Sequence, residues 1–325
     1  MQATALPPQG ISFTSYATTF IQNAPYREQK NGKSGLSKNT LRSYQNFFKI
    51  WLKFEQQFEA PLYFKELDQN KVTQFKQWLL EDCNYSLNNV GRILSALKTI
   101  CLDAQKNDIP THPYVNFIRA ISQSRQQKII HTLSFEEIKK IENCKVPQNL
   151  ENTKKWLIIG CWIGQRVSDL LTLTPGQIRP SKNKGIYVDI FQQKTQKHVT
   201  VGVINPLAIR FLTTEFPKKM YAPKFNKQLK DVLKLAGITQ MVTAQKFNGK
   251  IKRKETGIFP KYAVIASHDL RRSFATNFYS KIPTALLMNM TGHSRETTFL
   301  KYIGLEENRD SYADDFMRGI SQLEL

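Results

Sequence analysis

The chain has 325 residues, of which 41% are hydrophobic and 22% charged, a composition typical of a folded globular protein with room for two domains. Its most apolar run, residues 156–163, is far shorter than the ~20 residues that span a bilayer, which argues against a membrane protein. Lys and Arg total 47 against 26 Asp and Glu, so the formal charge of +21 favours a polyanionic partner such as nucleic acid over a generic basic surface.

The first third of the chain predicts a bundle of helices. Apolar residues recur at helical spacing in three stretches, for which Thr40, Asp68 and Ser86 are the expected N-caps. Aromatic residues on such stripes usually form a core, so we expect them to be buried rather than stacked on DNA bases. These stretches predict a first, helical domain over residues 11–121.

A linker is predicted over residues 122–131, because a polar run follows two prolines, Pro110 and Pro113. Ser134 and Glu137 then form a capping box that opens a helix and a second domain, residues 132–325.

The second domain mixes helices with a little strand. Its expected elements are a helix over 156–173 interrupted near Gly164, a hairpin of strands 186–191 and 198–203, helices over 206–214 and 223–236, a basic loop or hairpin over 241–261, and short helices from 267 onward. The fold class is therefore mainly α with a small β-sheet or hairpin.

Six chemically capable residues follow one another in this second domain. They are Arg166 in Gly-Gln-Arg, Lys194 in the hairpin turn, His268 and Arg271 in His-Asp-Leu-Arg, His293 in Thr-Gly-His, and Tyr302 nine positions later. This ordered set resembles the tyrosine recombinase, or phage integrase, family. The resemblance covers the second domain, and the first domain is similar in its helical pattern to the family's core-binding domain.

The resemblance implies a DNA strand-transfer site in which Tyr302 is the nucleophile. Arg166 and Arg271 would grip the scissile phosphate, since paired guanidiniums bind its oxygens in a planar, bidentate way. His293 would add a third donor, and His268 would act as base because a phenol titrates near 10. Lys194 on its hairpin is similar to the family's general acid.

Two positions depart from the family's usual pattern. Asp169 stands where the family often has Glu, and Thr291 precedes Gly-His where Leu is usual. Each catalytic candidate judged alone also has an ordinary structural explanation: Arg166 could pair with Asp169, Lys194 could be a solvated turn residue, and Tyr302 could belong to the core. The matched order of all six is what favours an active site.

The expected partner is double-stranded DNA carrying specific recombination sites. Candidate DNA contacts are basic or polar positions in both domains: Thr40, Arg42, Lys49, Arg92, Lys250, Lys252, Arg253 and Lys254. The basic segment that holds the last four resembles that of integrases from mobile elements. By analogy with the family, a C-terminal helix over 306–320 would pack on a neighbouring subunit in a homotetramer on DNA, with a monomer allowed when free; folding back on its own domain is the alternative.

No metal or other cofactor is expected, because the four cysteines are scattered without zinc-ligand spacing. The cysteines and the lack of a signal-peptide pattern in the first ten residues lead us to expect a cytoplasmic, nucleoid-associated enzyme of two domains. Two alternatives stay open at this stage: a type IB-like topoisomerase and a catalytically silent DNA-binding protein. The sequence does not indicate the target site, or whether the reaction integrates, excises, inverts or resolves.

Overall fold

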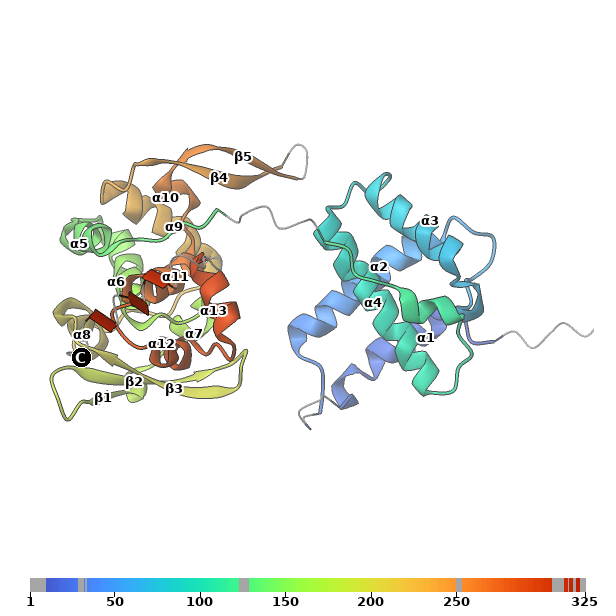
Figure 1. Cartoon of the computed structure of the whole chain (residues 1–325), viewed down its shortest axis with the longest axis horizontal. Coiled ribbons are helices and arrows are strands. Elements are labelled where there is room, and N and C mark those ends of the chain that lie inside the picture. The colour runs from blue at the N-terminus through green and yellow to red at the C-terminus, as the bar shows by residue number, and fades with distance from the viewer. Residues whose placement is uncertain are drawn as a thin grey trace, which may run out of the picture. The chain divides into compact units, whose positions relative to one another are not determined.

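The computed structural model describes residues 10–28, 32, 34–122, 129–249, 253–305, and positions 313, 314, 316, 317, 320 and 321. The chain divides into two compact units, residues 1–126 and 127–325. Both are mainly helical, and small antiparallel sheets belong to the second (Figure 1). This is the fold class that the sequence predicts.

The first unit is a helical bundle built on aromatic side chains. Its α-helices are α1 (Phe13–Gln22), α2 (Lys38–Glu55), α3 (Gln69–Leu80) and α4 (Leu87–Lys106), with 3-10 turns at Ala24–Tyr26, Phe64–Glu66 and Pro113–Phe117. Trp51 and Phe54 on α2 are fully buried, and Phe13 lies 4.3 Å from Trp51 between ring centroids. The predicted aromatic stripe is therefore core, as its helical spacing indicated.

One expected N-cap in this unit is wrong. Helix α2 begins at Lys38 and its N-cap is Ser37, whose Oγ accepts a 3.2 Å hydrogen bond from the backbone N–H of Thr40. Thr40 thus lies inside the first turn, because Ser37 already caps the backbone three residues earlier. Asp68 does cap α3 through the N–H of Lys71, and Ser86 occupies the N-cap position of α4.

The second unit is arranged around a buried helix. Its helices are α5 (Phe135–Asn143), α6 (Gln148–Ile163), α7 (Val167–Leu170), α8 (Pro206–Thr213), α9 (Ala222–Leu235), α10 (Lys261–Val264), α11 (Ser267–Phe278), α12 (Thr284–Thr291) and α13 (Glu296–Ile303), and a 3-10 turn spans Pro175–Gln177. The second half of α6, residues 156–163, is apolar on all sides because α5, α8, α9 and α11 pack around the helix. A smaller cluster, centred on Phe274, Leu287 and Phe299, joins α11, α12 and α13.

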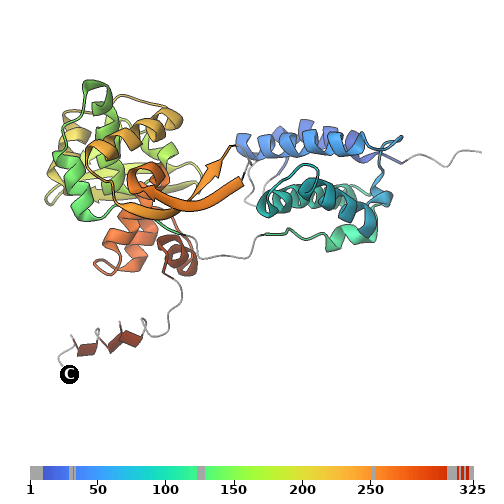
Figure 2. The same ribbon diagram turned by 90° about the horizontal axis from the view of Figure 1, so that it is seen from above.

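Two antiparallel sheets complete the second unit. The predicted hairpin is β2 (Ile186–Gln192) with β3 (Lys197–Val203), and a short strand that the sequence did not reveal, β1 (Ile178–Pro180), adds to its edge. The basic segment forms a hairpin of β4 (Met241–Asn248) and β5 (Arg253–Pro260), which extends from the unit as a twisted ribbon (Figure 2).

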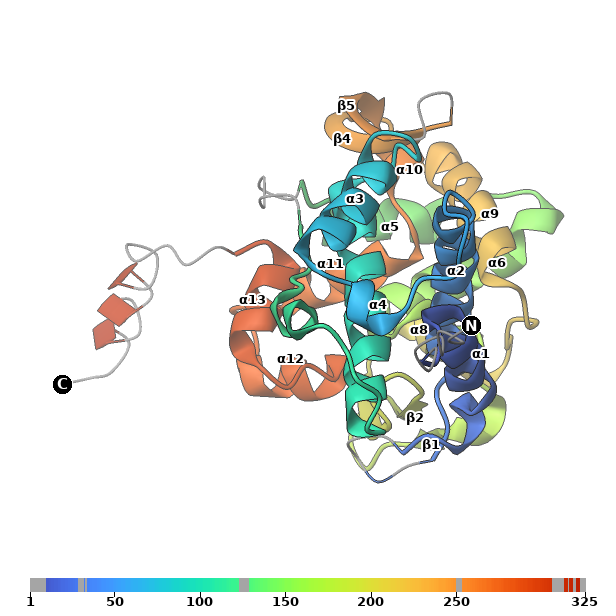
Figure 3. The same cartoon turned by 90° about the vertical axis from the view of Figure 1, so that its right-hand side faces the viewer.

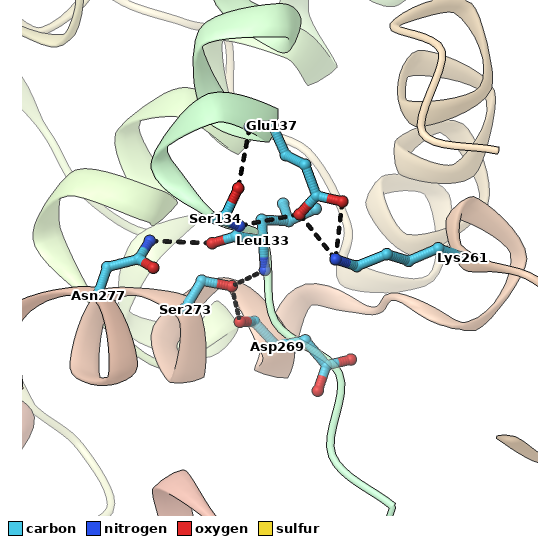
Figure 4. Close-up of polar contacts among 7 residues, drawn as sticks. All are labelled: Leu133, Ser134, Glu137, Lys261, Asp269, Ser273 and Asn277. Carbon is cyan, nitrogen blue, oxygen red and sulfur yellow. Dashed lines mark hydrogen bonds and ion pairs between the residues drawn. The ribbon is translucent and has the colours of Figure 1, made fainter. Parts of the chain in front are cut away.

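Polar contacts fix the start of the second unit to α11 (Figure 4). The backbone N–H of Leu133 donates to Ser273 Oγ at 2.8 Å, and its carbonyl accepts from Asn277 Nδ2 at 2.9 Å. The predicted capping box follows, since Ser134 Oγ and the Glu137 carboxylate each accept the other's backbone N–H. Helix α11 is thereby held at its middle, and this helix carries three of the residues described below.

Within the described parts of the chain, none of the helices combines the length and apolarity needed to cross a membrane. The expected helix over 306–320 lies largely outside the described residues. Of its apolar positions, Phe316, Met317 and Ile320 are described and exposed, while Tyr312 is not described.

Candidate active site

Arg166 lies where the central helix breaks. Gly164 ends α6 in the left-handed conformation, with φ at +63°, and a Cβ there would come within 2.3 Å of the Phe274 ring. Only glycine fits this turn, which directs the next residues away from the helix axis. Arg166 then becomes the N-cap residue of α7, and its Nη1 donates to Gln192 Oε1 at 3.3 Å.

Helix α11 supplies His268, Arg271 and Arg272 from one side. These positions are three and four residues apart, so their side chains leave the same face of the helix. Arg271 is 1% exposed and donates through Nη1 to the carbonyl of Gly164 at 3.2 Å, while its Nη2 is buried without a hydrogen-bond partner among the described residues. Arg272 pairs with Asp269 at 2.7 Å.

Helices α12 and α13, which pack against each other (Figure 3), bring two further candidates to the site. Gly292 ends α12 with φ at +66°, and His293 follows it directly. Tyr302 lies in the last turn of α13. Arg272 holds this turn, because its Nε donates to the carbonyl of Tyr302 at 2.9 Å and its guanidinium lies 5.0 Å from the centroid of the Tyr302 ring.

The candidate side chains converge on Tyr302. Its ring centroid lies 5.0 Å from that of His293 and 5.3 Å from that of His268, and its hydroxyl donates a long, 3.4 Å hydrogen bond to the carbonyl of His268. Arg166 and Arg271 are near enough for each to influence the ionisation of His293. Four separate chain segments, including that of Tyr302, therefore meet in one cluster.

Burial and positive charge perturb the ionisation of this cluster. Desolvation, followed by repulsion from Arg166, lowers the pKa of Arg271 to about 10, so it remains cationic at neutral pH. Desolvation and the nearby Arg271 and Arg166 lower the pKa of His293 to about 4, so its imidazole is uncharged at neutral pH. Burial raises the pKa of Tyr302, although Arg271 and Arg272 partly oppose this.

Lys194 stands apart from this cluster. It is exposed in the turn between β2 and β3, and none of the described residues makes a hydrogen bond or ion pair with its side chain. The strand that leads to it is anchored at the site, because Gln192 Oε1 accepts from Arg166 and also from Thr195 Oγ1 at 2.8 Å. The end of β2 next to the turn is thus attached to the cluster formed by the other five candidates, whereas Lys194 itself makes no such contact among the described residues.

The sequence reasoning missed Gln192, although a signal was present. Ile186, Val188 and Ile190 alternate as the inward face of β2, and Gln192 continues that face fully buried. Its Nε2 donates to Gln165 Oε1 at 2.8 Å and to the carbonyl of Met290 at 3.3 Å. A polar residue at an inward strand position needs buried partners, which here join the hairpin to the loop after α6 and to α12.

The proposed DNA contacts of the first unit are surface residues. Arg42 and Lys49 on α2 line a hollow of about 590 Å³ together with Gln22, Gln45 and other side chains. Thr40 is exposed, and exposed Arg92 on α4 donates to Asn89 Oδ1 at 3.2 Å.

In the second unit, Arg253 and Lys254 begin β5, whereas Lys250 and Lys252 lie outside the described residues. Among the residues that the structure describes, no group of three or more His, Cys, Asp or Glu side chains could hold a metal ion.

Two family models match the chain. Residues 12–120 match the phage integrase SAM-like domain, and residues 131–309 match the phage integrase family. This chain belongs to the phage integrase family. It is a tyrosine site-specific recombinase.

Solved structures with the same fold share few residues with this recombinase. A lambda integrase fragment, seen as a dimer bound to a COC′ core site, is 15% identical with a TM-score of 0.63, over 92% of this chain and 97% of that one. XerH bound to a palindromic difH substrate is 16% identical with a TM-score of 0.62, over 94% and 95%. A Tn1549 transposon integrase bound to right-end DNA is 14% identical with a TM-score of 0.60, over 95% and 99%. No curated protein matches the sequence.

Proposed function

We propose that this recombinase breaks and rejoins double-stranded DNA at specific sites through a covalent bond between Tyr302 and a 3′-phosphate. The observation that carries the proposal is that Arg271, His268 and His293 surround Tyr302, with Arg166 next to Arg271 and His293. Structural packing alone gives no reason to gather two guanidiniums and two imidazoles around a phenol.

The arginines form the binding site for the scissile phosphate. Arg271 is almost fully buried and its Nη2 has no hydrogen-bond partner among the described residues; an unsatisfied buried donor costs roughly 1–3 kcal/mol, more when it is charged. A phosphate oxygen would satisfy that donor and would neutralise the repulsion between Arg271 and Arg166. The same donors stabilise the extra negative charge that the phosphorane-like transition state places on these oxygens.

In the proposed reaction, side chains account for every bond and proton, so neither a metal nor a nucleotide cofactor is needed. Tyr302 Oη attacks phosphorus as His268 takes the phenolic proton, the bond to the 5′-oxygen breaks, and Lys194 gives that oxygen a proton. The phosphodiester becomes a phosphotyrosyl ester, so the free energy of the bond is retained for rejoining. Lys194 can approach the leaving group because it lies on an exposed turn whose base is fixed at Gln192.

Exchange between two DNA sites follows when the 5′-hydroxyl of one strand attacks the phosphotyrosine formed on another, which produces a Holliday junction. We infer a homotetramer on DNA, with a monomer allowed when free, and action in the cytoplasm on nucleoid DNA. The net charge of +21 supports DNA as the partner. One solved relative, a lambda integrase, is a tetramer bound to a Holliday junction.

A nicked suicide substrate tests the central step. DNA that the protein protects is first identified by sequencing, and a nick is then placed beside the cleavage point so that the 5′-hydroxyl diffuses away. The wild type should accumulate a covalent protein–DNA adduct, and Tyr302→Phe should bind the same DNA without forming one. Absence of the adduct from the wild type on its own protected site would defeat the proposal.

A modified leaving group tests Lys194. Lys194→Ala should slow adduct formation by about 10²- to 10⁴-fold on ordinary DNA, the usual contribution of a general acid. A substrate whose 5′-bridging oxygen is replaced by sulfur needs no proton on its leaving group, so the variant should cleave it nearly as fast as the wild type. Equal losses on both substrates would exclude Lys194 as the proton donor. Lys197→Ala, at the start of β3, is the matched control.

A further inference from the structure

The last residue of α12, Thr291, makes buried hydrogen bonds that define which nitrogen of His293 carries its proton. Thr291 is 0% exposed. Its hydroxyl oxygen lies 2.6 Å from the carbonyl oxygen of Leu287, 3.4 Å from that of Met288 and 2.9 Å from Nδ1 of His293. The hydroxyl has one proton to donate and several groups that could receive it.

The shortest of these distances decides where that proton lies. A carbonyl oxygen has only lone pairs, so a 2.6 Å separation from Leu287 requires the Thr291 hydroxyl to donate to it. The remaining 2.9 Å bond must then run the other way, with Nδ1–H of His293 donating to Thr291 Oγ1. If Nδ1 were unprotonated, two lone pairs would face each other at hydrogen-bond distance inside the protein.

We propose that Thr291 is a positioning residue that holds His293 as the Nδ1–H tautomer, with a lone pair on Nε2 in the free protein. Leu, which the family usually has at this position, could not make such a bond, so the device belongs to this chain's own sequence. The backbone supports it, since His293 N–H donates to the carbonyl of Met288 at 2.9 Å and fixes the loop after Gly292.

The tautomer changes how His293 takes part in the reaction, an inference that rests on the proposed function. The charged and titratable groups facing His293 are Arg166, Arg271, His268 and Tyr302, and burial with the cationic neighbours keeps its imidazole neutral. Neutral His293 with its proton on Nδ1 has none on Nε2 to donate to a phosphate oxygen. It must gain a proton when the anionic phosphate enters, and it then donates from both nitrogens.

Nitrogen-15 NMR of the free, full-length protein tests the tautomer directly, because protonated and unprotonated imidazole nitrogens have well-separated chemical shifts. At neutral pH, His293 of the wild type should show a protonated Nδ1 and an unprotonated Nε2, with assignment by loss of the signal in His293→Gln. Thr291→Ser keeps the hydroxyl and should keep this pattern, whereas Thr291→Val removes it and should move the proton wholly or partly to Nε2. A wild type protonated on Nε2, or an unchanged tautomer in Thr291→Val, would overturn the assignment.

The rate of adduct formation on the nicked substrate tests the consequence. Between about pH 8 and about pH 5, the range in which imidazoles titrate, the ratio of the wild-type rate to the Thr291→Val rate should rise as the pH falls, while the ratio to Thr291→Ser stays flat. A ratio to Thr291→Val that is independent of pH would refute the coupling to proton uptake. If the wild type forms no adduct at all, the proposed function fails, but the tautomer is still decided by the spectra.

Discussion

Replacing Gly292 by alanine should disturb the candidate site more than the same change at another glycine of the second unit. Gly292 has φ at +66°, and a Cβ there would lie 2.0 Å from Gln192 Oε1. Gly237 has φ at +74° with nothing within 4 Å of its Cβ position. The two substitutions share the backbone strain and differ in the clash, so Gly237→Ala is the matched control.

The magnitude follows from what each alanine meets. The left-handed conformation costs an L-residue roughly 1–2 kcal/mol, and this is the whole cost expected at Gly237. At Gly292 the buried Gln192 must also move, which breaks the hydrogen bonds that its Oε1 accepts from Arg166 and Thr195. At about 0.5–1.5 kcal/mol each, these add roughly 1–3 kcal/mol.

Thermal unfolding of the full chain measures the difference. In a unit of this size, 1 kcal/mol shifts Tm by about 2–4 °C, so Gly292→Ala should melt roughly 2–12 °C below Gly237→Ala. Adduct formation on the nicked substrate should also fall in Gly292→Ala alone, because Gln192 fixes the base of the hairpin that carries Lys194. Equal Tm values and equal adduct rates for the two variants would refute the contact between Gly292 and Gln192 as a determinant of the site.

Three further predictions concern Arg272, His293 and the net charge. Arg272→Ala should lower the free energy of unfolding by about 3–5 kcal/mol, because it removes the ion pair with the partly buried Asp269 carboxylate and releases the carbonyl of Tyr302. Denaturant unfolding measures this, and a loss below about 1 kcal/mol would contradict it. The folded pKa of His293, about 4, lies below its unfolded value of about 6.5, so the unfolded state binds more protons between these two pH values. The free energy of unfolding should therefore fall as the pH drops through this window, and His293→Gln should make its dependence on pH less steep. DNA affinity should fall linearly on a logarithmic plot against salt concentration, with a slope of about −0.9 for each phosphate neutralised, and an affinity insensitive to salt would argue against phosphate contacts.

The sequence predicted most helices because their apolar residues recur at helical spacing, and the capping pairs marked several starts. The start of α2 was misjudged because Ser37 and Thr40 are both good capping residues, and only the hydrogen bond between them shows which one caps. Helix α1 was not predicted, and strand β1 is too short to show a periodic pattern.

The six candidate residues could be named from the sequence because their types and order suffice for a family resemblance. The clustering of five of them could not be predicted, since it depends on long-range packing of α6, α11, α12 and α13. Local spacing placed His268 and Arg271 on one helix face, but it said nothing of Tyr302 lying 5.0 Å from His293 between ring centroids.

Composition and local periodicity were enough to predict the fold class and the basic character, and the family resemblance identified the set of chemical groups. The surroundings of those groups depend on the tertiary structure: Nη2 of Arg271, buried without a hydrogen-bond partner among the described residues, the buried bridge of Gln192, and the contact of Thr291 with His293. Such properties depend on burial and on distances between segments far apart in the chain, because desolvation and hydrogen bonding act through space.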